Sequence, residues 1–458
     1  MIEGRPTGLF RINGRGRRHT LAVMAALGFA LALSGGASRY DEWQQTAVRL
    51  AAIAAAVALS WFRSPAIQRG PLLAILALYL LPALQLVPMP AEWWAELPGH
   101  DVYGRIALET GHFDWRPLSL TPDLTMDALL SLLPATAACI GALQLDGRGR
   151  TRLAQGIVVI AISSALLGLA QLGAAGTALH LYQQSNPDAP VGLFANRNHQ
   201  AVFQACSLPL IGALAARALR EARDPKIVLA MGLGATLLLL MTAALTGSRM
   251  GLLLALVGLA GAVLCFRAGG GRLPFSRRAR RGAAAAMAGG LLLAAVAAWQ
   301  GGAIQRLAVT DSASETRLAA LPALIETARS FMPLGAGFGS FDPVYRRFEP
   351  DVLLSTVYLN EAHDEPLQLA IEGGVPAILL LALFLIWWGR SATRIVRGVG
   401  GVRRRGLGLA AATVTAQLML SSLVDYPLRT PLLGALFLVM CVEMMRAAAV
   451  ETEATAHA

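Results

Sequence analysis

Long apolar runs alternate with short polar segments along this chain of 458 residues. Examples are the runs that begin at Leu21, Ile227 and Val375. An α-helix rises about 1.5 Å per residue, so about 20 apolar residues cross the hydrocarbon core of a bilayer. A soluble helix of this length would instead carry a polar face along its whole length. The pattern therefore predicts an all-α polytopic membrane protein.

Twelve membrane-spanning helices are predicted from these runs. They cover residues 20–36, 46–62, 71–88, 124–145, 153–175, 199–216, 227–246, 249–266, 283–300, 367–388, 406–424 and 430–448. The predicted organisation is a basic segment 1–19, a transmembrane domain 20–448 and a tail 449–458.

Two connections between the predicted spans are long enough to hold structure of their own. They are residues 89–123 and 301–366. The second contains apolar residues at helical spacing after Ser312, which predicts an amphipathic helix on the membrane surface. The expected fold is thus a helical bundle with a helical loop outside the membrane.

The distribution of charge predicts the orientation of the bundle. With both termini in the cytoplasm, the inner segments hold 27 of the 39 basic residues, and the outer segments hold 21 of the 28 acidic residues. This agrees with the rule that cytoplasmic loops are rich in Lys and Arg. The net charge of +11 therefore reports topology and attraction to anionic membrane lipids, and no nucleic-acid partner is expected.

One histidine stands out where a polar outer segment meets an apolar span. The stretch NEAHDEPLQLAIEGGVP, residues 360–376, places His363 among Glu361, Asp364 and Glu365. An imidazole beside carboxylates can accept a proton from an attacking hydroxyl group. The alternative is a histidine that only caps the helix that follows.

Two arginines occupy positions on the same face where a cation is costly. Arg249, in TGSRMG, lies between two spans with almost no loop around it. Arg317 lies in the first turn of the predicted surface helix, where the helix dipole disfavours positive charge. The alternatives are that Arg249 only reaches back to the interface and that Arg317 is an ordinary solvated side chain.

Other polar residues share a position at the outer ends of the spans. They are Arg39, Arg197, Asn198, His199, Asp364, Asp425 and Arg429. If these ends converge, they form one polar pocket that is rich in arginine. The planar guanidinium group suits phosphate oxygens, so the expected ligand is a phosphorylated lipid or sugar.

Neither a metal nor a cofactor is expected in this pocket. The histidines and carboxylates lack the spacing of a zinc site. The glycine-rich PLGAGFGSF, residues 333–341, lacks the strand–turn–helix context of a nucleotide loop, and a tight turn beside the membrane is predicted instead.

Five motifs resemble the O-antigen ligase and Wzy-type polymerase superfamily of bacterial membrane glycosyltransferases. In chain order they are NRNH at 196–199, GSRMG at 247–251, SETRL at 314–318, PLGAGFGSF at 333–341 and AHDEPLQLAIEGG at 362–374. GGASRYD at 35–41 resembles the first outer loop of many members. The family histidine is often followed by asparagine, where this chain has Asp364.

The resemblance implies a fold of the lipid-linked-sugar, GT-C-like glycosyltransferase kind. It also implies metal-independent transfer of a glycan from undecaprenyl diphosphate to a sugar hydroxyl at the periplasmic face of the inner membrane. By motif, His363 would activate the acceptor, and Arg249 and Arg317 would hold the diphosphate. Arg39, Arg197, Asn198, His199, Asp364 and Asp425 would then line the substrate site.

The acceptor stays open at this point. A ligase transfers the glycan to lipid A–core, a polymerase transfers it to another lipid-linked repeat, and a relative glycosylates protein. A transporter of the same lipid-linked sugar is the alternative from a different class. It would carry charges in the middle of its spans and show repeat symmetry.

Overall fold

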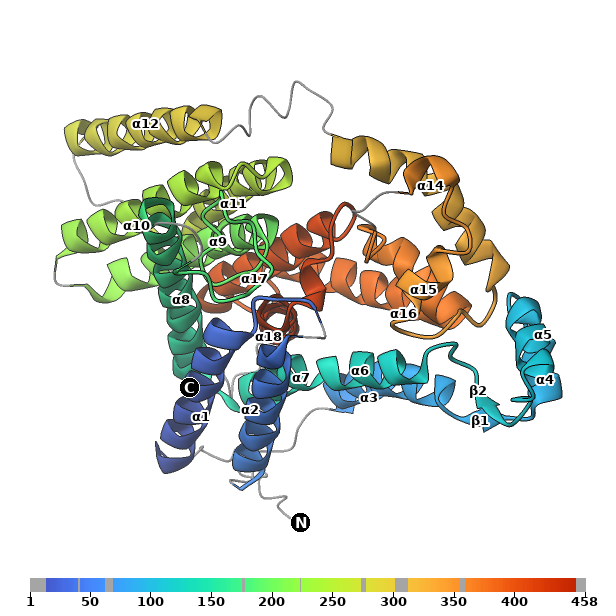
Figure 1. Ribbon diagram of the computed structural model, residues 1–458. Coiled ribbons are helices and arrows are strands. Elements are labelled where there is room, and N and C mark those ends of the chain that lie inside the picture. The colour runs from blue at the N-terminus through green and yellow to red at the C-terminus, as the bar shows by residue number, and fades with distance from the viewer. Residues whose placement is uncertain are drawn as a thin grey trace, which may run out of the picture.

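The computed structural model describes residues 14–39, 42–61, 69–174, 178–222, 224–272, 277–300, 312–354 and 359–449 (Figure 1). The first half contains α1 (Gly14–Ser34), α2 (Trp43–Ser60), α3 (Arg69–Gln85), β1 (Pro88–Met89), α4 (Ala91–Ala95), α5 (Asp101–Glu109), β2 (Arg116–Pro117), α6 (Pro122–Ser131), α7 (Leu133–Gln144), α8 (Gly147–Gly173) and α9 (Arg197–Glu221). The second half contains α10 (Pro225–Leu245), α11 (Arg249–Ala268), α12 (Arg277–Gln300), α14 (Ser312–Ser330), α15 (Phe341–Tyr345), η1 (Asp351–Leu353), α16 (Glu365–Val396), α17 (Val402–Ser421), η2 (Pro427–Arg429) and α18 (Pro431–Ala448).

The chain is an all-α multi-pass membrane protein. Every predicted span falls on a helix, and the span 124–145 falls on the consecutive helices α6 and α7. Within the described residues, seven segments are long and apolar enough to cross a membrane: Pro122–Gln144, Gly147–Gly173, Arg197–Glu221, Pro225–Leu245, Arg249–Ala268, Glu365–Val396 and Pro431–Ala448. Helix α3 contains a shorter apolar helix, Gly70–Gln85. The number of twelve spans stays a prediction.

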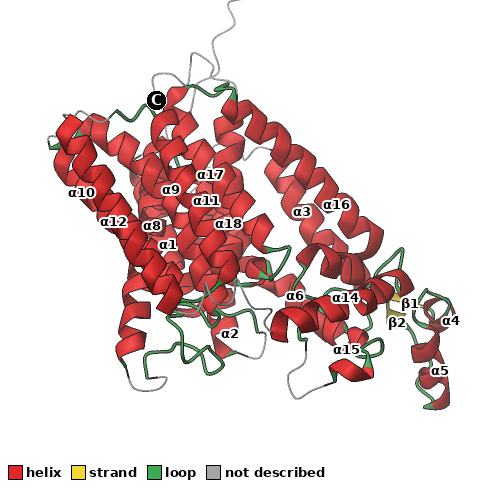
Figure 2. Cartoon of the chain, turned by 90° about the horizontal axis from the view of Figure 1, so that it is seen from above, coloured by secondary structure: helices red, strands yellow, loops and turns green. Residues whose placement is uncertain are grey.

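The long helices lie side by side along a common direction, which gives the bundle two distinct faces (Figure 2). We call the face at which α9, α11, α16 and α18 begin the His363 face, and the opposite face the Arg150 face. Backbone hydrogen bonds join segments at the His363 face, including Leu432 N–H to Gly35 O (2.9 Å) and Ala195 N–H to Gly36 O (3.1 Å). The ends of α1, α9 and α18 therefore converge, although they are far apart in the sequence.

Helix α9 is the centre of the bundle and packs against α8, α10, α11 and α17. It is the most buried of the seven candidate spans. Small residues allow the close approach: a Cβ added at Gly212 would lie 2.1 Å from the carbonyl oxygen of Ala262 in α11, and one at Gly258 would lie 2.5 Å from that of Ala205. Close packing of small residues is how helices associate in a membrane.

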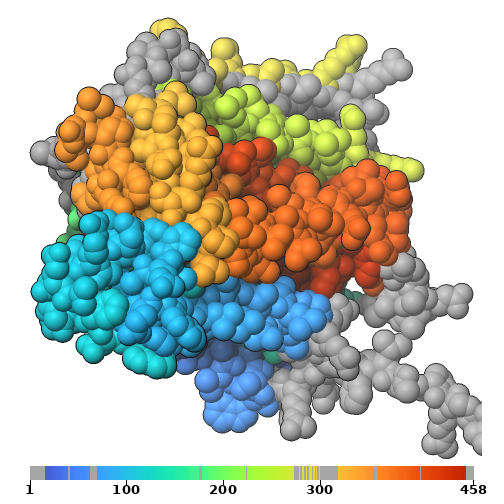
Figure 3. Space-filling view, turned by 90° about the vertical axis from the view of Figure 1, so that its right-hand side faces the viewer, coloured from blue at the N-terminus to red at the C-terminus, as the bar shows by residue number. Residues whose placement is uncertain are grey.

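The two long connections fold against each other beside the bundle. β1 and β2 pair antiparallel around α4 and α5. Gly99 of this segment meets the ring of Phe331, and Arg347 Nη2 lies 3.8 Å from Asp101 Oδ1. Figure 3 shows the two segments side by side, α4 and α5 in cyan and α14 and α15 in orange. The predicted surface helix is α14, although the side chains of residues 312–317 lie outside the described residues.

Helix α16 is broken at Gly374, which has φ 59° and ψ −152°. The turn formed by PLGAGFGSF fits into this break, with hydrogen bonds from Ala336 N–H to Ile371 O (2.9 Å), Gly337 N–H to Glu372 O (2.9 Å) and Val375 N–H to Pro333 O (2.8 Å). Its glycines have φ angles of 79°, 107° and 84°. The backbone of this motif therefore forms hydrogen bonds with α16 on both sides of its break, and the motif is a turn, as predicted.

The break at Gly374 generates a stability prediction. A methyl group there would lie 2.2 Å from the carbonyl oxygen of Pro333, in a backbone region reserved for glycine. Gly374→Ala should therefore lower the free energy of unfolding by about 1–3 kcal/mol, measured as thermal unfolding in detergent. Gly389→Ala, in the same helix with open space around it, is the matched control and should leave stability unchanged or slightly raised. Equal effects of the two substitutions would contradict this account of the break.

The two faces generate a topology prediction. Val352 is 89% exposed beside the His363 face, and Val402 is 61% exposed at the Arg150 face. In a background without the four native cysteines, Val352→Cys should react with a membrane-impermeant maleimide in intact cells, while Val402→Cys should react only after permeabilisation. The reason is the excess of basic residues in 390–405, which predicts that this connection faces the cytoplasm. Labelling of both cysteines in intact cells would contradict the predicted spans.

Candidate functional site

The NRNH motif begins α9 and places three polar side chains at the His363 face. Asn196 is the N-cap, and its Oδ1 accepts a hydrogen bond from the backbone N–H of Asn198 (2.8 Å). A capping asparagine at this position satisfies one of the free donors at the helix start. Asn198 and His199 therefore have a fixed orientation towards the start of α18.

Asp425, in the connection between α17 and α18, is the partner of both residues. Its Oδ2 accepts a hydrogen bond from Asn198 Nδ2 (3.0 Å), and its Oδ1 lies 3.8 Å from His199 Nε2. Oδ1 also accepts a hydrogen bond from the backbone N–H of Tyr426 (2.9 Å). Burial alone would raise the pKa of Asp425, but His199, His363 and this N–H together lower it below its usual range. A buried carboxylate is thus held ionised at the site.

Tyr426 lies between two imidazoles. Its ring centroid is 5.5 Å from that of His199 and 4.9 Å from that of His363, both in edge-to-face geometry. His363, the expected catalytic residue, is therefore brought next to the Asp425 cluster. Its Nδ1–H donates to the carbonyl oxygen of Glu361 (2.9 Å). Because a carbonyl only accepts, the lone pair of the neutral ring is on Nε2.

The carboxylates that flank His363 have structural partners of their own. Asp364 is the N-cap of α16, and its Oδ1 accepts from Leu367 N–H (3.0 Å). Glu365 accepts from Leu428 N–H (3.2 Å). His363 therefore precedes the cap and is not the cap itself. Asparagine and aspartate are equally good N-caps, so Asp364 supports the helix start as well as the asparagine that is usual in the family.

A buried ionic cluster lies directly behind His363. Arg429 in η2 pairs with Glu361 (3.3 Å) and with Glu372 (3.2 Å). Burial opposes the charge of Arg429, but the carboxylates around it raise its pKa overall. Burial raises the pKa of Glu361, and the charge of Arg429 works in the opposite direction. The cluster connects η2, the segment before His363 and the first half of α16.

The other expected residues lie around this centre at the same face. Arg249 is the first residue of α11, after the N-cap Ser248, and Gly251 of the same turn packs against Ala201 of α9. Arg197 is the first residue of α9, and its backbone N–H donates to Asn186 Oδ1 (3.0 Å). Arg249, Arg197 and Arg39 are all partly exposed. They lie at the same face as His363.

Arg317 is the sixth residue of α14 and lies in its second turn, one turn later than expected, and its side chain is outside the described residues. Its helix is nevertheless placed beside the site. Ala320, one turn further on, belongs to a buried apolar cluster that includes Ala362, the neighbour of His363. The start of α14 thus approaches the segment that carries the histidine.

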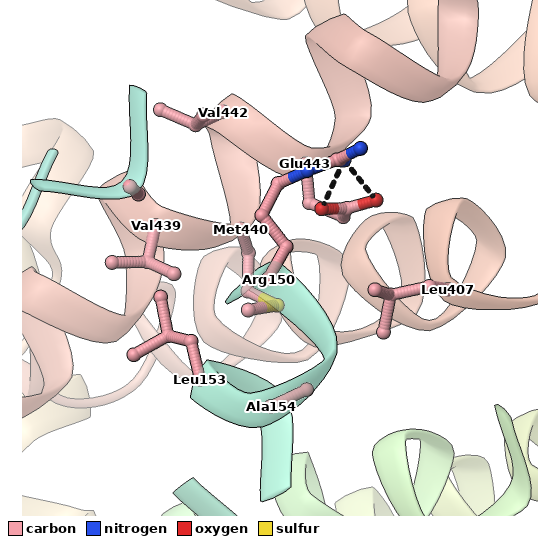
Figure 4. Close-up of a pocket in the computed structure, with 9 residues that line it drawn as sticks. Arg150, Leu153, Ala154, Leu407, Val439, Met440, Val442 and Glu443 are labelled. Carbon is pink, nitrogen blue, oxygen red and sulfur yellow. Dashed lines mark hydrogen bonds and ion pairs between the residues drawn. The ribbon is translucent and has the colours of Figure 1, made fainter. Parts of the chain in front are cut away.

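A small pocket lies at the opposite end of the bundle, near the Arg150 face. Arg150 forms a bidentate ion pair with Glu443 there, at 2.8 and 2.7 Å, beside apolar side chains of α7, α8, α17 and α18 (Figure 4). None of the expected site residues lines it. Among the described residues, no group of three or more His, Cys, Asp and Glu is arranged to hold a metal ion.

Comparison with known families adds an independent observation. Residues 234–382 match the family model Wzy_C, described as O-antigen ligase. This part of the chain is therefore similar to the O-antigen ligase family. The match confirms the resemblance seen in the motifs, includes Arg249, Arg317 and His363, and supports a ligase- or polymerase-type function in the membrane. No curated protein matches the chain.

The sequence did not point to every residue at the centre of this site. Tyr426, Gln368 and Glu372 were not expected to contribute to it. Gln368 and Glu372 lie within AHDEPLQLAIEGG at a spacing of four residues, which places both on one side of a helix. Two polar residues at that spacing, at the start of an apolar span, could have indicated that both face the site.

Proposed function

We propose that this protein transfers a glycan from undecaprenyl diphosphate to a sugar hydroxyl at the periplasmic face of the inner membrane, as in O-antigen ligation to lipid A–core. The transmembrane domain 20–448, with a GT-C-like fold, holds the site, and both termini face the cytoplasm. The family match supports this class of reaction. The observation that carries the proposal is the position of His363 at the centre of the polar cluster.

His363 is the general base in this proposal. Its Nδ1–H is held by the Glu361 carbonyl, so Nε2 accepts the proton of the acceptor hydroxyl. The hydroxyl oxygen then forms a bond to the anomeric carbon of the donor glycan, and the bond between that carbon and the diphosphate breaks. Asp425, ionised and close to His363, stabilises the imidazolium that results.

Arg249 and Arg317 bind the diphosphate and stabilise the charge that develops on it as it leaves. Arg39, Arg197, Asn198, His199, Asp364 and Asp425 complete the substrate site or hold it in shape. Guanidinium groups placed before the reaction stabilise such a charge without reorganisation. The partners are thus the lipid-linked donor, a glycan or glycolipid acceptor, and membrane lipids.

The functional test is a reconstitution with identified products. Purified protein in liposomes is given an undecaprenyl-diphosphate glycan together with lipid A–core. A glycan on lipid A–core supports ligation, and longer lipid-linked chains support polymerisation instead. Movement of the donor across the bilayer without a new glycosidic bond would support a transporter and contradict the proposal.

His363 and Arg317 variants should separate catalysis from binding. His363→Asn should lower turnover by about 10²–10⁴-fold, because it removes proton transfer while asparagine tolerates the left-handed backbone. Donor binding should stay close to normal. Arg317→Ala should lose both binding and turnover, and Arg317→Lys should recover little of either because a lysine cannot reproduce the planar fork.

These variants are checked by donor binding and by initial rates on protein purified to equal folded content. His363→Ala is the second variant at the same position and should behave like His363→Asn. Near-normal turnover in both would contradict the role of His363 as a base. Normal donor binding by Arg317→Ala would contradict the assignment of the diphosphate to that arginine.

Activity should also persist in the presence of chelator. If arginines stabilise the leaving diphosphate, EDTA should change the initial rate by less than about twofold. Complete loss of activity in EDTA, restored by added magnesium, would show that a metal ion stabilises the diphosphate instead.

A further inference from the structure

His363 has a backbone conformation that needs external support. It is the one residue other than glycine with a positive φ angle, 54°, among the residues that the structure describes. The left-handed region is unfavourable for a residue with a Cβ atom, so neighbouring groups must hold it. The groups that hold His363 also fix where its ring points.

Gln368 is the first of these groups. Its Oε1 accepts from the backbone N–H of Ala362, the residue before His363 (2.9 Å). Its Nε2 donates to the carboxylates of Glu361 and of Glu372, the second at 3.0 Å. Gln368 is 1% exposed, so these are its partners in place of water. One amide therefore fixes the peptide before His363 and depends on the carboxylates of Glu361, which is partly buried, and Glu372, which is buried.

Arg429 is what allows those two carboxylates to lie together. Its Nη1 is 3.3 Å from Glu361 Oε2, and its Nη2 is 3.2 Å from Glu372 Oε2. Two buried carboxylates repel each other unless a cation lies between them. Without Arg429, the Glu361 side chain would either take up a proton or move away from Glu372. Movement of Glu361 would also displace its backbone carbonyl, which orients the His363 ring.

The network of Gln368, Glu361, Glu372 and Arg429 is anchored at both ends by other parts of the fold. Glu372 directly precedes the break in α16, and its carbonyl oxygen accepts from Gln85 Nε2 (2.9 Å) and from Gly337 N–H (2.9 Å). Arg429 lies a few residues after Asp425 and Tyr426, which face His363. A displacement of Arg429 would thus disturb both sides of the imidazole.

We propose that Arg429 is a positioning residue for His363, acting through Glu361, Glu372 and Gln368, and that it does not bind the donor. This rests on the proposed function, in which His363 is the general base. Arg429 would then set the rate of the chemical step and not the affinity for the lipid diphosphate. A purely structural ion pair would instead affect only stability.

The test compares two arginines that each neutralise buried glutamate. Arg429→Met should lower kcat by about 10²-fold, because a misplacement of about 1 Å costs this much. Its donor dissociation constant should stay within about twofold of wild type. Arg150→Met is the matched control, since Arg150 pairs with Glu443 at the other end of the bundle. It should lower the melting temperature but leave kcat of the folded protein within about twofold.

Two further variants keep the test informative if Arg429→Met does not accumulate. Glu361→Gln retains an acceptor for Gln368 but loses the ion pair, and should lower kcat by about tenfold or more. Arg429→Lys keeps the charge but cannot join both carboxylates in the same way, so it should lie between wild type and Arg429→Met. The double variant Arg429→Lys with Glu361→Gln should be no slower than the slower single variant, because both act through one unit.

Three outcomes would overturn the proposal. The first is an unchanged kcat in both Arg429→Lys and Glu361→Gln. The second is a loss of donor binding in the Arg429 variants that is as large as their loss of rate. The third is a double variant whose kcat falls by the product of the two single effects. His363→Asn is measured in the same assay. If it is fully active, the assignment of the base has failed, whereas a slow His363→Asn with a normal Arg429 series refutes only the positioning role.

Discussion

The break of α16 at Gly374 is the feature on which the site depends. Backbone N–H and C=O groups released by a broken helix must find partners at a membrane, where water is scarce. Here the turn 333–341 supplies them, and Gln85 binds both that turn and the carbonyl of Glu372. The first half of α16 is thereby held independently of the spanning half, and the segment before it carries His363 into the polar cluster.

The electrostatics of the cluster follow from this arrangement. Asp425 is buried, yet its pKa is lowered because His199, His363 and the backbone N–H of Tyr426 face it. The paired carboxylates behind His363 share a single guanidinium, that of Arg429. The acidic groups closest to the imidazole therefore all have hydrogen-bond or ion-pair partners within the protein. The arginines at the starts of α9 and α11 are partly exposed at the same face, where an anionic ligand can approach.

The motifs picked out in the sequence have distinct physical roles in this chain. PLGAGFGSF contributes backbone conformation, since three of its glycines have positive φ angles. NRNH contributes an N-cap together with the partners of Asp425. In AHDEPLQLAIEGG, the proposed function confines the chemistry to His363, while Asp364, Gln368 and Glu372 hold the backbone and side chains around it. Arg429 lies outside the matched family residues, yet it completes the support.

Local pattern determined much of this protein. The hydropathy of each run predicted the helices, because a spanning helix makes its hydrogen bonds within its own segment. Order and spacing of the motifs predicted the family resemblance, and position at the outer ends of the spans predicted that Asn198, His199, His363 and Asp425 share one face. Only the tertiary structure decided how these side chains meet. Asn198 and Asp425 are 227 positions apart, and the network that supports His363 joins η2 to α16 across 57 positions. Such contacts depend on how helices pack, which no local periodicity contains.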